Sequence, residues 1–105
     1  MDVLLRIKRL VLQDRVRYTV KAKEEMRQCE LEEAEVLESI MNARTIDKVL
    51  RSRSPNRENA SERLYVIKSV SFQGTAIYTK GKITREGDQE VFYVLISAKL
   101  DEFGS

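Results

Sequence analysis

The spacing of the apolar residues changes near Ala43, and this change constrains the fold more than any other feature of the sequence. Before Ala43, apolar side chains recur every three or four residues, as in helices with one buried face. After it, they alternate in segments rich in β-branched and aromatic residues, as in strands. Because the helices precede the strands, we predict an α+β fold in which N-terminal helices pack on a three- to four-stranded antiparallel sheet.

Helices are expected over residues 2–14, 20–29 and 32–42. Asp2 and Thr19 stand at the start of the first two, and both residue types are favoured as N-caps. Residues 15–18 are interpreted as a short extended connection. The glutamates of the second and third helices are interpreted as a solvated face, and Cys29 as a small core residue.

Strands are expected over residues 45–51, 63–70, 75–84 and 91–99. The first two are joined by a polar loop, residues 51–62, which holds the only proline of the chain, and residues 85–89 close a hairpin between the last two. The last strand is apolar on both faces over residues 91–96, which indicates an inner strand. Regular alternation puts Tyr93 and Lys99 on the same face of it.

The composition limits the possible chemistry. A chain of 105 residues suits a single domain with one core. No apolar run reaches the roughly 18 residues that a membrane helix needs, so we expect a cytoplasmic protein without a membrane partner. With one cysteine and no histidine, neither a metal nor another cofactor is expected, and histidine-dependent nucleophilic catalysis is excluded. Acid–base chemistry would have to come from Lys, Arg, Tyr or carboxylate side chains.

Charge is segregated along the chain, although the net charge is only +2. Residues 44–85 hold ten basic and three acidic side chains, and residues 1–23 hold seven and two. Residues 24–43 and 86–105 are acidic instead. Such patterning concerns partners more than fold. The basic central block could meet nucleic acid, and the alternative is a salt-bridged surface without such a partner.

The segment 75–84 has two different faces. One suits a core and carries Ile77, Thr79, Gly81 and Ile83. The other presents a phenol and two ammonium groups, from Tyr78, Lys80 and Lys82, which suit a phosphate backbone with an unstacked base nearby. An edge strand that uses lysines against aggregation has the same pattern. Lys68 lies on an otherwise apolar strand face, so its ammonium group either extends into solvent or takes part in a functional site.

Two stretches of the chain resemble the RelE-superfamily toxins, in particular the MqsR-type mRNA interferases and the BrnT-like domains. The first is Ile7-Lys8-Arg9-Leu10-Val11 followed by Val16-Arg17-Tyr18-Thr19 and a helix pair, and the second is the hairpin from Gly81 to Lys99. The sequence departs from the pattern in two places. Lys21 stands where many BrnT-like proteins have histidine, and Thr84 where MqsR-type proteins have tyrosine.

The resemblance implies a RelE- or barnase-like fold and metal-independent cleavage of mRNA, in which a ribose 2′-oxygen attacks the adjacent phosphate and a 2′,3′-cyclic phosphate is formed. Such a reaction needs cations on the phosphate oxygens and a proton donor at the leaving oxygen. The candidate catalytic residues are Tyr78, Lys82 and Lys99. The candidate RNA-binding residues are Lys68, Lys80, Arg85, Arg51 and Arg53.

The expected partners are therefore RNA and, as in other toxin–antitoxin pairs, an antitoxin protein that covers the basic face. Two other functions fit the sequence: a non-catalytic RNA-binding or regulatory module, and a protein-interaction domain whose charge blocks dock another protein. Pairing through the hairpin predicts that Tyr78 lies near residues 95–97 and Lys82 near residues 91–93. Tyr78 and Lys99 then become neighbours only if their side chains share a face.

Overall fold

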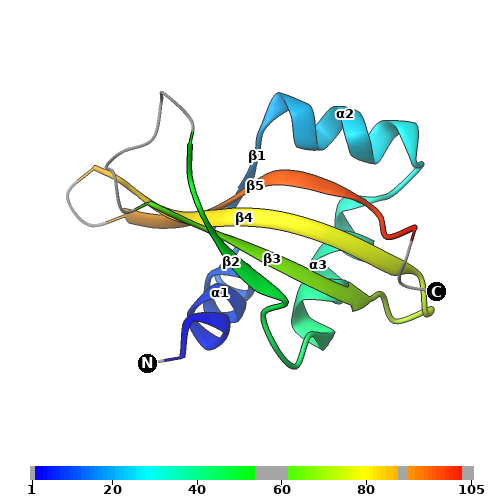
Figure 1. Ribbon diagram of the computed structural model, residues 1–105, viewed down its shortest axis with the longest axis horizontal. Helices are drawn as coiled ribbons and strands as arrows, with labels where there is room; N and C mark the ends of the chain where they lie inside the picture. The colour runs from blue at the N-terminus through cyan, green and yellow to red at the C-terminus, as the bar shows by residue number, and fades with distance from the viewer. Residues whose placement is uncertain (1, 54–61, 88–89, 103–105) are drawn as a thin grey trace.

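The computed structural model describes residues 2–53, 62–87 and 90–102. These residues form three helices and five strands (Figure 1). The helices are α1 (Val3–Leu12), α2 (Val20–Gln28) and α3 (Glu33–Asn42). The strands are β1 (Val16–Tyr18), β2 (Lys48–Arg51), β3 (Arg63–Val70), β4 (Ala76–Glu86) and β5 (Glu90–Leu100).

The predicted helices and strands are confirmed, with boundaries that differ by at most three residues. Both predicted N-caps are also present. The Asp2 carboxylate accepts a hydrogen bond from the Leu4 amide at 2.9 Å, and the Thr19 hydroxyl accepts one from the Ala22 amide at 3.1 Å. Most of the predicted loop at 51–62, and part of the hairpin at 85–89, lie outside the described residues.

The sheet differs from the prediction in strand number and direction. Its order is β1-β5-β4-β3-β2, and β1 runs parallel to β5 while the other neighbours are antiparallel. The expected sheet of three to four antiparallel strands is therefore wrong in detail, although the α+β class is correct. The extra strand is the segment predicted as a connection, and three residues are too few to show a period of two.

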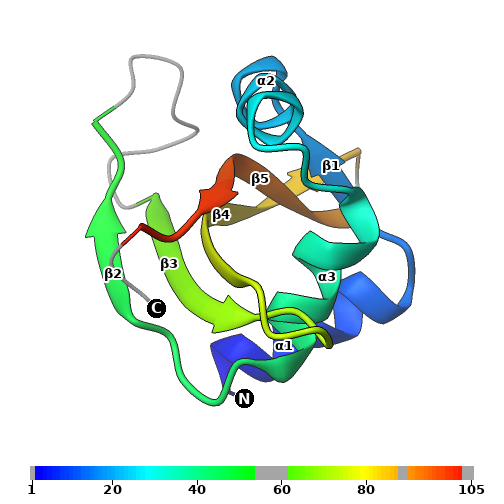
Figure 2. The same cartoon turned by 90° about the vertical axis from the view of Figure 1, so that its right-hand side faces the viewer.

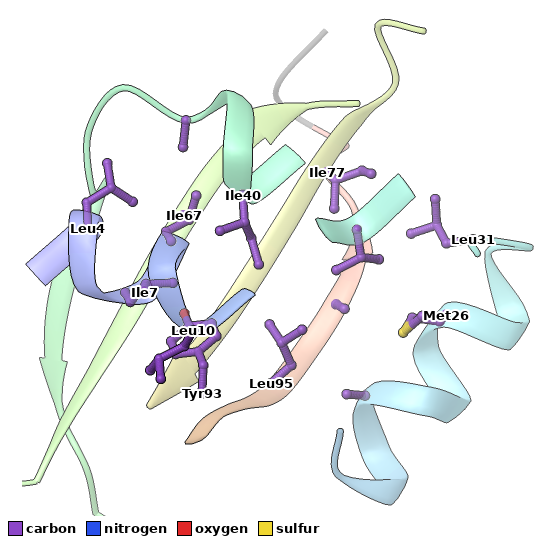
Figure 3. Close-up of a cluster of buried hydrophobic side chains, with 14 residues drawn as sticks. Leu4, Ile7, Leu10, Met26, Leu31, Ile40, Ile67, Ile77, Tyr93 and Leu95 are labelled. Carbon is purple, nitrogen blue, oxygen red and sulfur yellow. The ribbon is translucent and has the colours of Figure 1, made fainter. Parts of the chain in front are cut away.

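Helices α1 and α3 cover one face of the sheet (Figure 2). One cluster of buried side chains unites all three helices with β3, β4 and β5, and Figure 3 shows its larger members. Among them are Ile7, Ile40, Ile67 and Ile77, each fully buried. The predicted alternation of β4 is confirmed, because Ile77, Thr79 and Gly81 are buried on this face. None of the helices in the described part of the chain is long and apolar enough to cross a membrane.

A β-bulge lies between β4 and β5. Lys80 pairs with Ser97 while the next residue, Gly81, pairs with Leu95, so Ile96 is the extra residue on β5. The bulge inverts the alternation of β5. Tyr93 and Leu95 face the core before it, and Ala98 faces the core after it.

The expectation that Tyr93 and Lys99 share a face is consequently wrong. Tyr93 is fully buried in the core, whereas Lys99 lies opposite Tyr78 on the other side of the sheet. The predicted pairing of the hairpin is also shifted, since Lys82 lies opposite Val94. Both errors have the same origin, because neither the bulge nor the turn register can be derived from a pattern of period two.

Helix α2 and its N-cap residue form hydrogen bonds to the edge of β5 at the bulge, just beyond the end of β1. The Thr19 backbone amide donates to the Leu95 carbonyl at 3.0 Å, and its hydroxyl donates to the Ile96 carbonyl at 3.2 Å. Further along, a Glu25 carboxylate oxygen accepts from the Ser97 hydroxyl at 2.6 Å and from the Ala98 amide at 3.2 Å. Backbone groups that a longer β1 would have paired are thus satisfied by α2.

Close packing at Gly81 gives a test of this arrangement. A Cβ atom added there would lie 2.5 Å from Cζ of Tyr93, so we expect Gly81→Ala to lower the free energy of unfolding by about 1–3 kcal/mol. Replacing the ring removes the clash, so the same change should cost less in a Tyr93→Leu background. Urea denaturation of the four proteins of this double-mutant cycle measures the difference. Equal costs in both backgrounds would contradict the packing.

Candidate functional site

The face of the sheet opposite α1 and α3 carries most of the predicted site residues, and we call it the open face. In Figure 2, α2 and β2 stand at its two borders. It is defined by side chains of β3, β4 and β5 that share one side of the sheet through their cross-strand pairing: Lys68, Tyr78, Lys80, Lys82, Val94 and Lys99.

Tyr78 lines the first of two pockets that we describe on the open face. Its direct cross-strand neighbours are Lys68 on β3 and Lys99 on β5, so a phenol is flanked by two ammonium groups. Nζ of Lys99 lies 5.4 Å from the centre of the Tyr78 ring. These three side chains line a pocket of about 310 Å³ together with Leu100, Asp101 and Glu102. The pocket is large enough for one or two groups of the size of a phosphate or a small ring.

Lys80 is the neighbour of Tyr78 along the strand on the same face. The pKa of its ammonium group is lowered from the usual 10.5, first because burial penalises the charge and next because Lys21 of α2 lies close. Lys99 acts in the same direction, and Glu25 opposes both. Lys80 therefore has a larger neutral fraction near pH 7 than an ordinary surface lysine.

The phenol of Tyr78 is shifted in the opposite sense. Burial raises its pKa above 10.0, and the negative charges of Glu25, Asp47 and Asp101 raise it further. The hydroxyl therefore stays protonated across the physiological range and can donate a hydrogen bond or a proton. A lysine whose pKa is lowered and a tyrosine whose pKa is raised stand two residues apart on one strand face, and groups whose pKa values are shifted in opposite directions are what acid–base pairs use.

Lys82 belongs to a second pocket on the same face. It lies four residues from Tyr78, or about 13 Å along the strand. Its ammonium group pairs with the carboxylate of Glu62 at 3.3 Å, and both side chains are largely buried. This pocket measures about 340 Å³ and is lined by Thr19, Ser52, Arg53, Glu62, Leu64, Lys80, Lys82 and Ile96. Lys80 lines this second pocket. It is also the next residue after Tyr78 on the open face, so it lies between the two pockets.

The predicted site residues are therefore only partly brought together. Tyr78 and Lys99 meet directly, and Lys68 and Lys80 join them, but Lys82 is separate and ion-paired. Arg53 borders the second pocket. Arg85 follows Thr84 on β4, so its side chain points to the helix side of the sheet. Arg51, on the edge strand β2, pairs with Arg63 of β3, and this pair also points away from the open face.

Two residues that act on the candidate site were missed by the sequence prediction. Glu25 was assigned to a solvated face, yet it is half-buried and bonded to β5, and its carboxylate lies 4.0 Å from Nζ of Lys99. Lys21, at the start of the same helix, acts on the charge of Lys80. Only the unfavourable position of a lysine at a helix N-terminus signalled Lys21, and nothing local signalled Glu25.

Comparison of the chain with protein-family models, with curated proteins and with solved structures finds no significant match. The geometry of the open face is therefore the basis for any functional inference. Among the residues that the structure describes, no three Asp, Glu or Cys side chains come together in a way that could hold a metal ion.

Removal of one neighbouring charge tests the electrostatics of this site. Lys21→Gln should raise the pKa of Lys80 towards its usual value, because a like charge that disfavours the protonated form is removed. Lys23→Gln, two residues further along α2, is the matched control, and we expect it to leave Lys80 unchanged. The measurement is a titration of the lysine side-chain carbon signals by NMR. An equal response to both substitutions, or none to Lys21→Gln, would contradict the assignment.

Proposed function

We propose that this protein is a metal-independent endoribonuclease that binds single-stranded RNA on the open face and cleaves it beside Tyr78. The observation that carries the proposal is the register of three strands, which flanks Tyr78 with Lys68 and Lys99 and puts Lys80 next to it. A phenol between two ammonium groups, at a pocket of about 310 Å³ with the amine of Lys80 nearby, is suited to a phosphodiester with an adjacent unstacked base.

The charges of the site support a phosphodiester as the ligand. Lys68 and Lys99 are exposed and line the first pocket, so both can reach a phosphate bound there. Asp101 and Glu102 border the same pocket on one side, so the cations would hold the backbone while the carboxylates accept hydrogen bonds from ribose hydroxyls or base amino groups. The ribose 2′-hydroxyl is the group by which such a site can distinguish RNA from DNA.

The proposed cleavage needs no group from outside the chain. Neutral Lys80 accepts the proton of the 2′-hydroxyl, and the 2′-oxygen forms a bond to phosphorus. Lys68 and Lys99 stabilise the negative charge that develops on the non-bridging oxygens. The bond from phosphorus to the 5′-oxygen then breaks while Tyr78 donates a proton to that oxygen. The products are a 2′,3′-cyclic phosphate and a 5′-hydroxyl. Lys80 then releases its proton to solvent and Tyr78 takes one up, which restores both groups.

We also propose a toxin role, which rests on the sequence resemblance alone. The resemblance to the RelE-superfamily toxins would make the natural substrate mRNA and the natural inhibitor an antitoxin protein. An inhibitor that blocks the open face would need to neutralise the ammonium groups around Tyr78, so we expect an acidic segment in that partner.

Cleavage of RNA in the presence of EDTA tests the proposal. We expect the wild-type protein to produce 2′,3′-cyclic phosphate ends. Lys99→Ala should lower the rate by about 10²–10³-fold, as loss of a group that stabilises transition-state charge does. Tyr78→Phe should lower it by about 10²–10⁴-fold through loss of the proton donor. Lys23→Ala, an exposed lysine outside both pockets, is the control and should keep wild-type activity.

The two outcomes against the proposal are distinct. Rates that persist in both variants would place the chemistry elsewhere. Binding without any cleavage by the wild-type protein would leave an RNA-binding protein that is not a nuclease.

The pH dependence of the rate gives an independent test. Lys80 must be neutral to act as the base, so the rate should rise with pH until the pH passes the pKa of Lys80, which lies below 10.5. Lys21→Gln raises that pKa, so the rising limb should move to higher pH in this variant. Single-turnover rates measured across the pH range give the two profiles. A rising limb that stays at the same pH in the variant would exclude Lys80 as the base.

A further inference from the structure

The open face extends beyond the two pockets to an aromatic platform near the hairpin. The Arg17 guanidinium lies over the Phe92 ring, 4.3 Å from its centre, and Arg15 approaches the same ring at 5.8 Å. We propose that Phe92 and Arg17 form a second base-stacking subsite for single-stranded RNA. The inference rests on the proposed function and specifies how much of a substrate the protein holds.

Strand register puts this platform on the same side of the sheet as Tyr78. Phe92 pairs with Thr84, which belongs to the open-face series of β4. Arg17 of β1 pairs with Val94, and Val94 pairs with Lys82. Because side chains of directly paired residues share a face, the platform continues the surface that carries the lysines.

The chemistry of the platform suits an unpaired base. Phe92 is only half-buried, and Arg17 is exposed above it. A guanidinium that lies on an aromatic ring offers its outer plane to a further planar group, and both arginine planes and aromatic rings stack nucleobases. The open face therefore has a stacking group and cations at each end. At one end these are Phe92 and two arginines, and at the other they are Tyr78 and two lysines.

The distance between the two stacking groups indicates the length of the ligand. Thr84, the partner of Phe92, is six residues from Tyr78, which corresponds to about 20 Å along the strand. Lys80 and Arg53 lie between them and can contact the intervening phosphates, while the charge of Lys82 is compensated by Glu62. A span of this length suits an extended single strand of about four nucleotides, the lower end of the site sizes of single-strand binding domains.

Oligonucleotides of two lengths test the subsite. The probes are a dinucleotide and a hexanucleotide with 2′-O-methyl groups, which block attack by the 2′-oxygen and so separate binding from cleavage. We expect the wild-type protein to bind the hexanucleotide at least about tenfold more tightly than the dinucleotide, because a second stacked base contributes. Fluorescence polarisation or competition against a labelled hexanucleotide measures both affinities.

Two substitutions identify the platform as the source of this difference. Arg17→Gln and Phe92→Leu should each weaken hexanucleotide binding by about tenfold and leave dinucleotide binding unchanged. Arg17 is exposed, so its substitution tests the subsite even if Phe92→Leu impairs folding. Arg6→Ala on α1, an exposed arginine on the helix-covered side of the sheet, is the control and should change neither affinity.

The outcomes separate this inference from the proposed function. Equal loss for both probes in the variants would mean that Arg17 only packs on Phe92, and would overturn the subsite. Affinity that does not depend on length, with dinucleotide binding intact, would overturn it as well and leave the proposed function standing. Failure of the wild-type protein to bind either probe would remove both.

Discussion

The bulge at Ile96 is the feature on which the candidate site depends. If the register near the hairpin continued without it, Tyr78 would lie opposite Ala98, and Lys99 would face the helices. The bulge occurs beside Gly81, where the ring of Tyr93 leaves no space for a Cβ atom. Gly81, the ring of Tyr93 and the extra residue Ile96 together allow β5 to direct side chains into the core on both sides of the bulge. The same arrangement places Lys99 beside Tyr78 on the open face.

Helix α2 links this local geometry to the electrostatics of the open face. Thr19 caps the helix and bonds to the bulge, and Glu25 bonds to the strand that follows it. The same helix brings Lys21 towards Lys80 and Glu25 towards Lys99. Glu25 thus both bonds to β5 and acts on the pKa values of Lys80 and Tyr78, so a change in the position of α2 would alter the structure and the electrostatics of the site together.

Much of the fold could be predicted because local patterns determine it. The change of period near Ala43, the capping residues and the two faces of β4 are each visible within a few consecutive residues. Features set by distant contacts could not be predicted: β1 is recognisable only through its pairing with β5, and Lys99 reaches the open face only through the bulge. For the same reason Tyr78 and Lys80 were found from the pattern, whereas the role of Glu25 was not.

Methyl NMR during titration with a 2′-O-methyl hexanucleotide tests most directly whether the open face is the RNA-binding surface. We expect shifts for methyl groups on the open face, those of Leu64, Val94 and Ile96. Leu5 and Leu12, which are exposed on α1, should not respond. Shifts confined to the α1 side, or no shifts at low salt, would contradict the assignment of the open face as an RNA site.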